Sequence, residues 1–146
     1  MSFVLDASVA LAWCFEDSTG SVADHALTAL EAGSEAVVPA LWRLELANVL
    51  VIAERRKRLT EADTARFLTL IDGLPIQVVP DHGTTRSMVA LARAHGLTAY
   101  DAAYLEVALR TGLPLATLDA RLASAAKVAG LSLVDGADLT LPPGIP

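Results

Sequence analysis

Four acidic residues come from well-separated parts of the sequence: Asp6, Glu45, Asp101 and Asp119. Asp6 and Asp119 directly follow expected strands, Glu45 lies inside the helix after the second strand, and Asp101 lies in the first turn of the helix after Gly96. In parallel α/β folds, the residues that act on ligands gather at the carboxyl ends of the strands. Oxygen donors, with no His or Cys among them, suit hard cations such as Mg²⁺ or Mn²⁺. The sequence therefore predicts one divalent-cation site at one edge of a sheet.

Each aspartate also has a simpler structural explanation. Asp is a favoured N-cap because its carboxylate accepts hydrogen bonds from the first backbone N–H groups of a helix. Asp6 and Asp119 both stand at the start of an expected helix, and Asp101 follows Thr98 at the spacing of a capping box. Taken singly, these three residues leave both interpretations open.

Glu45 is harder to explain as a structural residue. On a helix its neighbours are Leu41, Trp42 and Val49, with Asn48 one turn further on. A carboxylate among apolar side chains is costly to bury unless it is paired, protonated or bound to a cation. We therefore expect a partner from outside the helix, and a metal ion would serve; the alternative is a glutamate at the helix edge that reaches solvent.

The elements that would position these acids alternate between short apolar runs and amphipathic helices. We expect strands at residues 2–5, 36–38, 76–79, 113–117 and 131–134. We expect helices at 6–15, 21–32, 40–57, 60–72, from Asp81 or Thr84 to 95, at 98–111 and at 119–128. Strands separated by helices favour parallel pairing, which predicts an α/β fold, a three-layer α/β/α sandwich with a central parallel sheet.

The composition fits a single domain of about residues 1–140, with a loosely held proline-rich tail at 141–146. No apolar stretch approaches the ~18 residues of a membrane span, and we expect no membrane association. The start of the chain has no signal-peptide pattern, and its one cysteine, Cys14, forms no internal disulfide, so the default location is cytoplasmic. The net charge of −6 argues against a nucleic-acid binder, unless bound cations reverse the field around the acids.

Four segments around the acids together resemble one known family. They are VLDASVALAW at Asp6, PALWRLELANVL at Glu45, LTAYDAAYLEVAL at Asp101 and LATLDARLASAAKVAG at Asp119. In this order, and nearly end to end, the chain resembles PIN-domain ribonucleases, and among them the VapC-type toxins of toxin–antitoxin pairs. Any one of these motifs is weak, whereas four in order make a specific signal.

The resemblance implies a PIN-like sheet with strand order 3-2-1-4-5 and a metal-dependent endoribonuclease that cuts RNA. By position, Asp6, Glu45, Asp101 and Asp119 would be the catalytic acids, and Ser8 and Thr117 match hydroxyl positions that support them. Members of the family are usually homodimers, and a cognate antitoxin protein commonly blocks the acidic pocket.

For such a site we assign Asp6 and Asp101 as the main ligands of Mg²⁺ or Mn²⁺. Glu45 would hold a second ion or position water, with Asn48 beside it, and Asp119 would act through a bound water or support the other ligands. A carboxylate-held ion polarises the phosphoryl oxygen and lowers the pKa of its bound water, as phosphodiester hydrolysis requires.

A basic run, Arg55, Arg56, Lys57 and Arg58, ends the longest expected helix. Cations at a helix C-terminus offset the helix dipole, which is the commoner reason for such a run. The functional alternative is contact with RNA phosphates or with an acidic segment of an antitoxin. The sequence leaves both open.

Three other functions compete with the nuclease. Haloacid-dehalogenase-like phosphotransferases have a second aspartate where this chain has Ser8, which argues against that activity. A response-regulator receiver domain needs a lysine after a late strand, and the only lysines here are Lys57 and Lys127. A non-catalytic PIN-fold module that binds RNA or protein without cleavage remains open.

Overall fold

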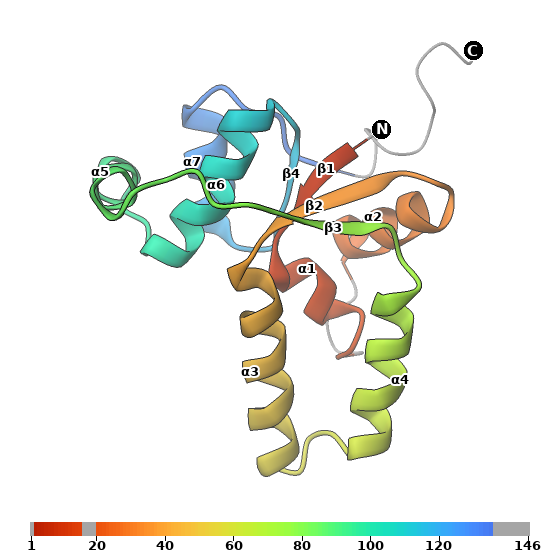
Figure 1. The fold of residues 1–146 in the computed structure, drawn as a ribbon. Helices are drawn as coiled ribbons and strands as arrows, with labels where there is room; N and C mark the ends of the chain where they lie inside the picture. The colour runs from red at the N-terminus through yellow and green to blue at the C-terminus, as the bar shows by residue number, and fades with distance from the viewer. Residues whose placement is uncertain (1, 16–19, 136–146) are drawn as a thin grey trace, which may run out of the picture.

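The computed structural model describes residues 2–15 and 20–135, so the expected tail at 141–146 lies outside the described residues. The chain alternates strands and helices in the predicted manner (Figure 1). The strands are β1 (Ser2–Leu5), β2 (Glu35–Pro39), β3 (Ile76–Val79) and β4 (Leu115–Ala116). The helices are α1 (Ala7–Ala12), α2 (Ser21–Glu31), α3 (Leu41–Arg55), α4 (Glu61–Asp72), α5 (Thr85–His95), α6 (Ala99–Thr111) and α7 (Ala120–Val128).

The sheet is parallel, with strand order β3-β2-β1-β4. This confirms the α/β class and the first four positions of the expected order. The expected fifth strand is reduced to an isolated parallel bridge between Leu133 and Leu115, at the place that strand would take. The difference has a local cause: β4 has only two residues, so it offers a fifth strand little backbone to pair with.

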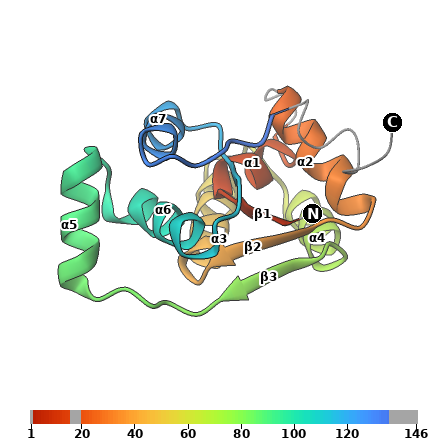
Figure 2. The ribbon, with the colours of Figure 1, turned by 90° about the horizontal axis from the view of Figure 1, so that it is seen from above.

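β1 is the centre of the core, and it is covered on both faces. Its consecutive residues Phe3, Val4 and Leu5 are all fully buried. Because successive side chains of a strand point to opposite faces, such a run requires helices on both sides of the sheet. α6 packs against β1 and β2, whereas α2 packs against β2 and α1 against α2 and α3 (Figures 1 and 2).

The pair α3 and α4 extends beyond the sheet as an antiparallel hairpin (Figure 1). The hydroxyl of Thr64 on α4 donates to Oε2 of Glu54 on α3 at 2.6 Å, which ties the two helices together near their far end. Thr60 and Asp63 form the predicted capping box at the start of α4. The hairpin is therefore a defined element of the structure.

Capping residues set the boundaries of α5 and α6. Thr84 caps α5, which decides between the two expected starts. Gly96 and Gly112 end α5 and α6 in the left-handed conformation, at φ +64° and +70°, which glycine adopts without strain. Among the described residues, no helix has both the length and the apolar character needed to cross a membrane.

Candidate active site

Asp6 lies at the carboxyl end of β1 and is only 5% exposed. The hydroxyls of Ser8 and Thr117 each donate to its Oδ2 at 2.7 Å. Although Asp6 occupies the N-cap position of α1, its side chain makes no capping hydrogen bond. The cap explanation therefore does not account for this buried carboxylate.

The two hydroxyls that hold Asp6 are themselves held by the backbone after β4. The backbone N–H of Leu118 donates to Oγ of Ser8, and that of Asp119 donates to Oγ1 of Thr117, both at 3.0 Å. Each hydroxyl accepts one hydrogen bond and donates another to the carboxylate. This network joins the ends of β1 and β4, so the carboxylate of Asp6 is fixed relative to Asp119.

Asp119 is both an N-cap and a neighbour of Asp6. Its Oδ1 accepts hydrogen bonds from the backbone N–H groups of Arg121 and Leu122 at 2.9 and 3.0 Å, which confirms the cap expected at the start of α7. Among the described residues, no hydrogen bond uses Oδ2. One oxygen of Asp119 thus remains available to a ligand or to water.

Asp101 stands in the first turn of α6. Its backbone N–H donates to Oγ1 of Thr98 at 3.1 Å, which is half of the expected capping box. Within the described residues, its carboxylate does not make the reciprocal bond to the backbone of Thr98. The cap therefore uses the backbone N–H of Asp101 and leaves its carboxylate without a hydrogen bond to Thr98.

Glu45 does have a partner outside its helix, and that partner is Tyr104 of α6. The Tyr104 hydroxyl, fully buried, donates a short hydrogen bond to Oε1 of Glu45. The sequence offered one signal for this contact: Tyr104 follows Asp101 by three residues and so lies on the same face of α6. The expected partner from outside the helix is thus present, although the sequence does not identify it as Tyr104.

The four acids are near enough to affect one another's ionisation. Burial raises the pKa values of Asp6, Glu45 and Asp101 above those of free carboxyls. Repulsion adds to each increase: the charge of Asp119 acts on Asp6 and Asp101, and the charges of Asp6 and Asp101 act on Glu45. The fold thus brings together carboxylates that are far apart in the sequence.

These acids lack a cationic partner in the described part of the chain. The ion pairs found there are Arg66 with Asp63 and Arg110 with Glu106, and neither involves the site. The described residues also contain no group of three acidic, His or Cys side chains already arranged to hold an ion. Asp6 is buried and the other three acids are partly buried. Carboxylates in such surroundings that repel one another and have no cationic partner there would be satisfied by a hard divalent cation, so the residues fit Mg²⁺ or Mn²⁺.

The remaining expected site residues lie further out. Asn48 is exposed on α3, and no hydrogen bond among the described residues joins it to the acids. The basic run is at the other end of α3, where Arg55 lies about 15 Å along the helix axis from Glu45. At this end Arg58 stacks over the ring of Phe15, with its guanidinium 5.2 Å from the ring centre.

Comparison with known proteins agrees with this geometry. The family model described as PIN domain matches residues 3–128. This chain belongs to the PIN-domain family. No curated protein matches it significantly. Among solved structures, the PIN domain is similar to PAE2754 from Pyrobaculum aerophilum, with 26% sequence identity and a TM-score of 0.66 over 86% of this chain and 79% of the other.

Proposed function

We propose that this PIN domain is a metal-dependent endoribonuclease, and that it is the toxin of a type II toxin–antitoxin pair of the VapC type. PIN domains are generally nucleases. The observation that carries the proposal is the convergence of Asp6, Glu45, Asp101 and Asp119, three of them with raised pKa values and without a paired cation among the described residues.

Each acid has a role that its surroundings support. Asp6 is buried and held by two hydroxyls, so with Asp101 it would bind the ion with little loss of side-chain freedom. Glu45, held at Oε1 by Tyr104, would present its other oxygen to a second ion or to the attacking water. Asp119, whose Oδ1 is used by the cap, would act through Oδ2 on a bound water. Bound Mg²⁺ or Mn²⁺ would supply charge neutralisation at the phosphate and a water of lowered pKa.

Cleavage of labelled RNA tests the catalytic part of this proposal. We expect the purified protein to cut RNA with Mg²⁺ or Mn²⁺ and to stop in EDTA. Asp101→Asn should abolish cutting, whereas Asp81→Asn, the same change at an exposed aspartate, should not. RNA binding without cleavage under all these conditions would instead support a non-catalytic module.

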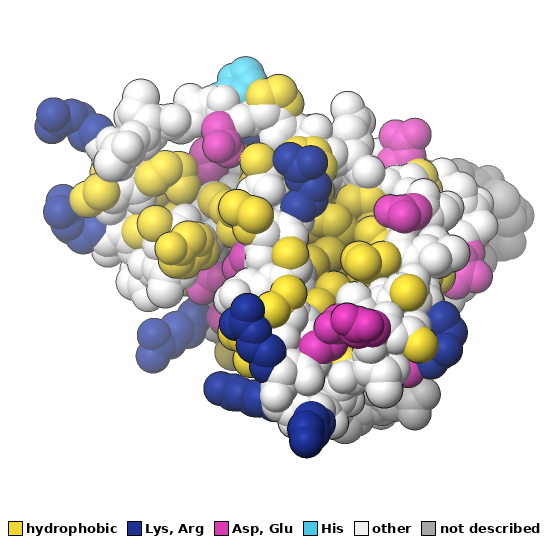
Figure 3. Space-filling view, turned by 60° about the horizontal axis from the view of Figure 1, so that its bottom comes forward, with side chains coloured by type: hydrophobic (Ala, Val, Ile, Leu, Met, Phe, Trp, Pro, Cys, Tyr) yellow, Lys and Arg dark blue, Asp and Glu magenta, His cyan; other side chains and the backbone are white. Residues whose placement is uncertain are grey.

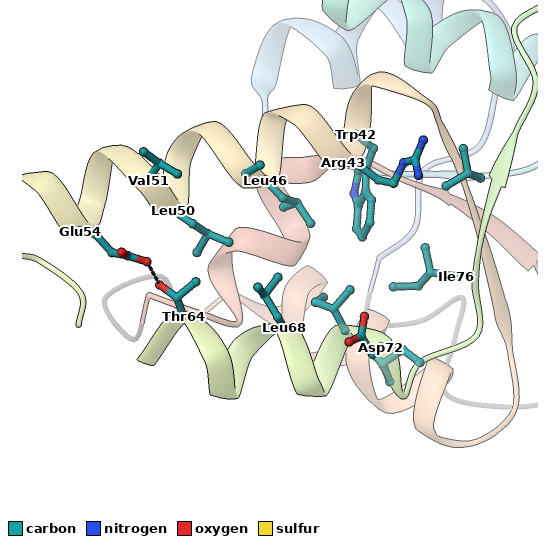
Figure 4. Close-up of a pocket in the computed structure, with 14 residues that line it drawn as sticks. Trp42, Arg43, Leu46, Leu50, Val51, Glu54, Thr64, Leu68, Asp72 and Ile76 are labelled. Carbon is teal, nitrogen blue, oxygen red and sulfur yellow. Dashed lines mark hydrogen bonds between the residues drawn. The ribbon is translucent and has the colours of Figure 1, made fainter. Parts of the chain in front are cut away.

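The antitoxin would dock in an apolar groove of about 480 Å³ between α3, α4 and β3 (Figure 4). Leu46 and Leu50 of α3 face Leu68 of α4 across it, and Ile76 of β3 lies at one end. Figure 3 shows hydrophobic side chains gathered on the face of the molecule around the α3–α4 hairpin, with charged side chains of both signs around them. An apolar floor with a mixed charged rim suits an amphipathic helix of a partner protein.

A growth assay tests the toxin role. Expression of the chain should arrest growth, and co-expression of the small protein encoded next to its gene should restore growth. Leu68→Asp in the groove should keep RNA cleavage but lose that rescue. Leu70→Asp, the same change on another face of α4, should still be rescued. Growth arrest that neighbouring genes fail to relieve would count against the antitoxin proposal.

We also propose a homodimer, as in the family that the sequence resembles. α5 packs on α6, yet none of its residues is fully buried, and Val89 is 45% exposed on it. A second copy would cover this amphipathic helix. In sedimentation experiments, Val89→Asp should convert the dimer to a monomer, whereas Thr69→Asp on the exposed side of α4 should not. A wild-type protein that sediments as a monomer would overturn the homodimer proposal.

A further inference from the structure

A second groove opens between the C-terminal end of α5 and the outer face of α7, and it encloses about 500 Å³. Arg121, Ser124 and Val128 of α7 line one side, at the spacing of a single helix face. His95 and Gly96 line the other side, at the end of α5. Figure 2 shows α5, α6 and α7 together at one end of the sheet.

Each wall of this groove contains a residue that is close in sequence to an acid of the site. Arg121 follows Asp119 by two residues, and its backbone N–H donates to Oδ1 of that residue. On the other wall, Gly96 precedes Thr98, whose hydroxyl accepts from the backbone of Asp101. Each wall therefore lies within a few residues, along the chain, of one of the four acids.

The charge of Arg121 has no structural explanation. A cation in the first turn of a helix opposes the helix dipole and is normally destabilising. No ion pair in the described part of the chain offsets this, because the pairs found there involve Arg66 and Arg110. Arg121 is also exposed, so its side chain is free to reach a ligand. A residue that breaks a local rule without a structural gain is a candidate for function.

We propose that this groove binds the nucleotide next to the cleaved bond of a single-stranded RNA, with Arg121 contacting its phosphate. The inference rests on the proposed ribonuclease function and extends it to the placement of the substrate. The small residues of the walls leave room for a sugar and base, while the His95 ring and the Ser124 hydroxyl offer hydrogen bonds. Arginine is suited to phosphate because its planar group donates two parallel hydrogen bonds.

Equilibrium binding tests the groove separately from catalysis. A short fluorescein-labelled single-stranded RNA of mixed sequence is titrated with the Asp101→Asn protein, which should not cleave it, with Mg²⁺ present. Adding Arg121→Gln should weaken binding about tenfold. It should also reduce the slope of log K against log salt by about 0.7, the value for one lost phosphate contact on a single strand. Arg66→Gln, which removes the same charge from α4, should change neither quantity.

Two further variants sharpen the test. Arg121→Lys keeps the charge and should retain the salt slope. Ser124→Glu places a negative charge inside the groove and should weaken RNA binding, whereas Thr69→Glu on α4 should not. If Arg121→Gln behaves like Arg66→Gln, or if Arg121→Lys loses as much slope as Arg121→Gln, the groove proposal is overturned. If the wild type fails to cleave RNA while these binding effects are seen, the ribonuclease proposal fails and the binding groove stands.

Discussion

The hydroxyl of Tyr104 donates its hydrogen bond to Oε1 of Glu45, which joins α6 to α3 across the site. Tyr104 is fully buried, so its hydroxyl is a rigid donor, and Glu45 is the one acid of the four whose side chain would otherwise be long and mobile. Burial, together with this contact, raises the pKa of Tyr104 above its usual range and so keeps the hydroxyl protonated as a donor.

We therefore predict that Tyr104 positions Glu45. Tyr104→Phe should weaken Mn²⁺ binding about tenfold, as loss of a group that orients a metal ligand commonly does. Cleavage should fall with it and recover when the Mn²⁺ concentration is raised. Calorimetric Mn²⁺ titration measures the first effect. Tyr100→Phe is the matched control, because Tyr100 is 66% exposed; equal Mn²⁺ affinities in the two variants would exclude the positioning role.

Metal binding should stabilise the fold, because a cation relieves the repulsion among the acids. We expect Mg²⁺ to raise the Tm of the wild type. Asp6→Asn keeps acceptors for Ser8 and Thr117 but removes the buried charge, so it should raise the Tm in EDTA and lose most of the Mg²⁺ effect. Scanning calorimetry with and without Mg²⁺ measures both. An unshifted wild type, or an equal shift in Asp6→Asn, would contradict this.

The raised pKa values also predict how stability depends on pH without metal. A carboxyl whose folded-state pKa is raised by burial is easier to protonate in the folded state than in the unfolded chain. Its stabilising contribution is complete below the unfolded pKa of about 4 and is lost as pH rises through the folded pKa. In EDTA, the free energy of unfolding of the wild type relative to Asp6→Asn should thus fall with increasing pH. Urea denaturation over a pH series measures it, and a relative stability that rises with pH would refute the assignment.

Ser8 should be costly to lose. Its hydroxyl connects the backbone N–H of Leu118 to the carboxylate of Asp6, so Ser8→Ala leaves both without that partner. We expect the free energy of unfolding to fall by about 1–3 kcal/mol. Urea denaturation in EDTA measures the change, with Ser132→Ala at an exposed serine as control. If the two variants are equally stable, the hydrogen-bond network around Asp6 contributes little to the free energy of unfolding.

Much of the fold could be predicted because its signals are local. Glycines after α5 and α6 and the threonine caps of α4 and α5 mark helix ends within a residue or two. The length of β4 could not be predicted in this way. The run from 113 to 117 predicts a full strand, yet pairing with β1 covers only Leu115 and Ala116. The length of a strand depends on how many backbone groups its neighbour pairs with, and one segment of sequence does not contain that information.

The proximity of the four acids could be expected because residues that follow parallel strands gather at one edge of the sheet, but the partners of the acids could not be predicted. Tyr104 sits in an apolar stretch of α6 and resembles any core aromatic residue until α3 is placed beside it. Arg121 resembles any exposed helix charge until the end of α5 is placed opposite it. Such roles arise from distances between elements, which a single sequence does not contain. The roles proposed for Asn48 and for the basic run from Arg55 to Arg58 remain predictions.

The acids come from almost the whole length of the chain, since Asp6 follows the first strand and Asp119 follows the last. The hydroxyl of Thr117, which holds Asp6, comes from the end of β4 as well. A nascent polypeptide on the ribosome therefore lacks both the fourth acid and part of the support of the first until Thr117 and Asp119 have been added. If the protein cuts RNA as proposed, the nascent chain is inert until those residues have been made and folded, and it does not cut the message that encodes it during that time.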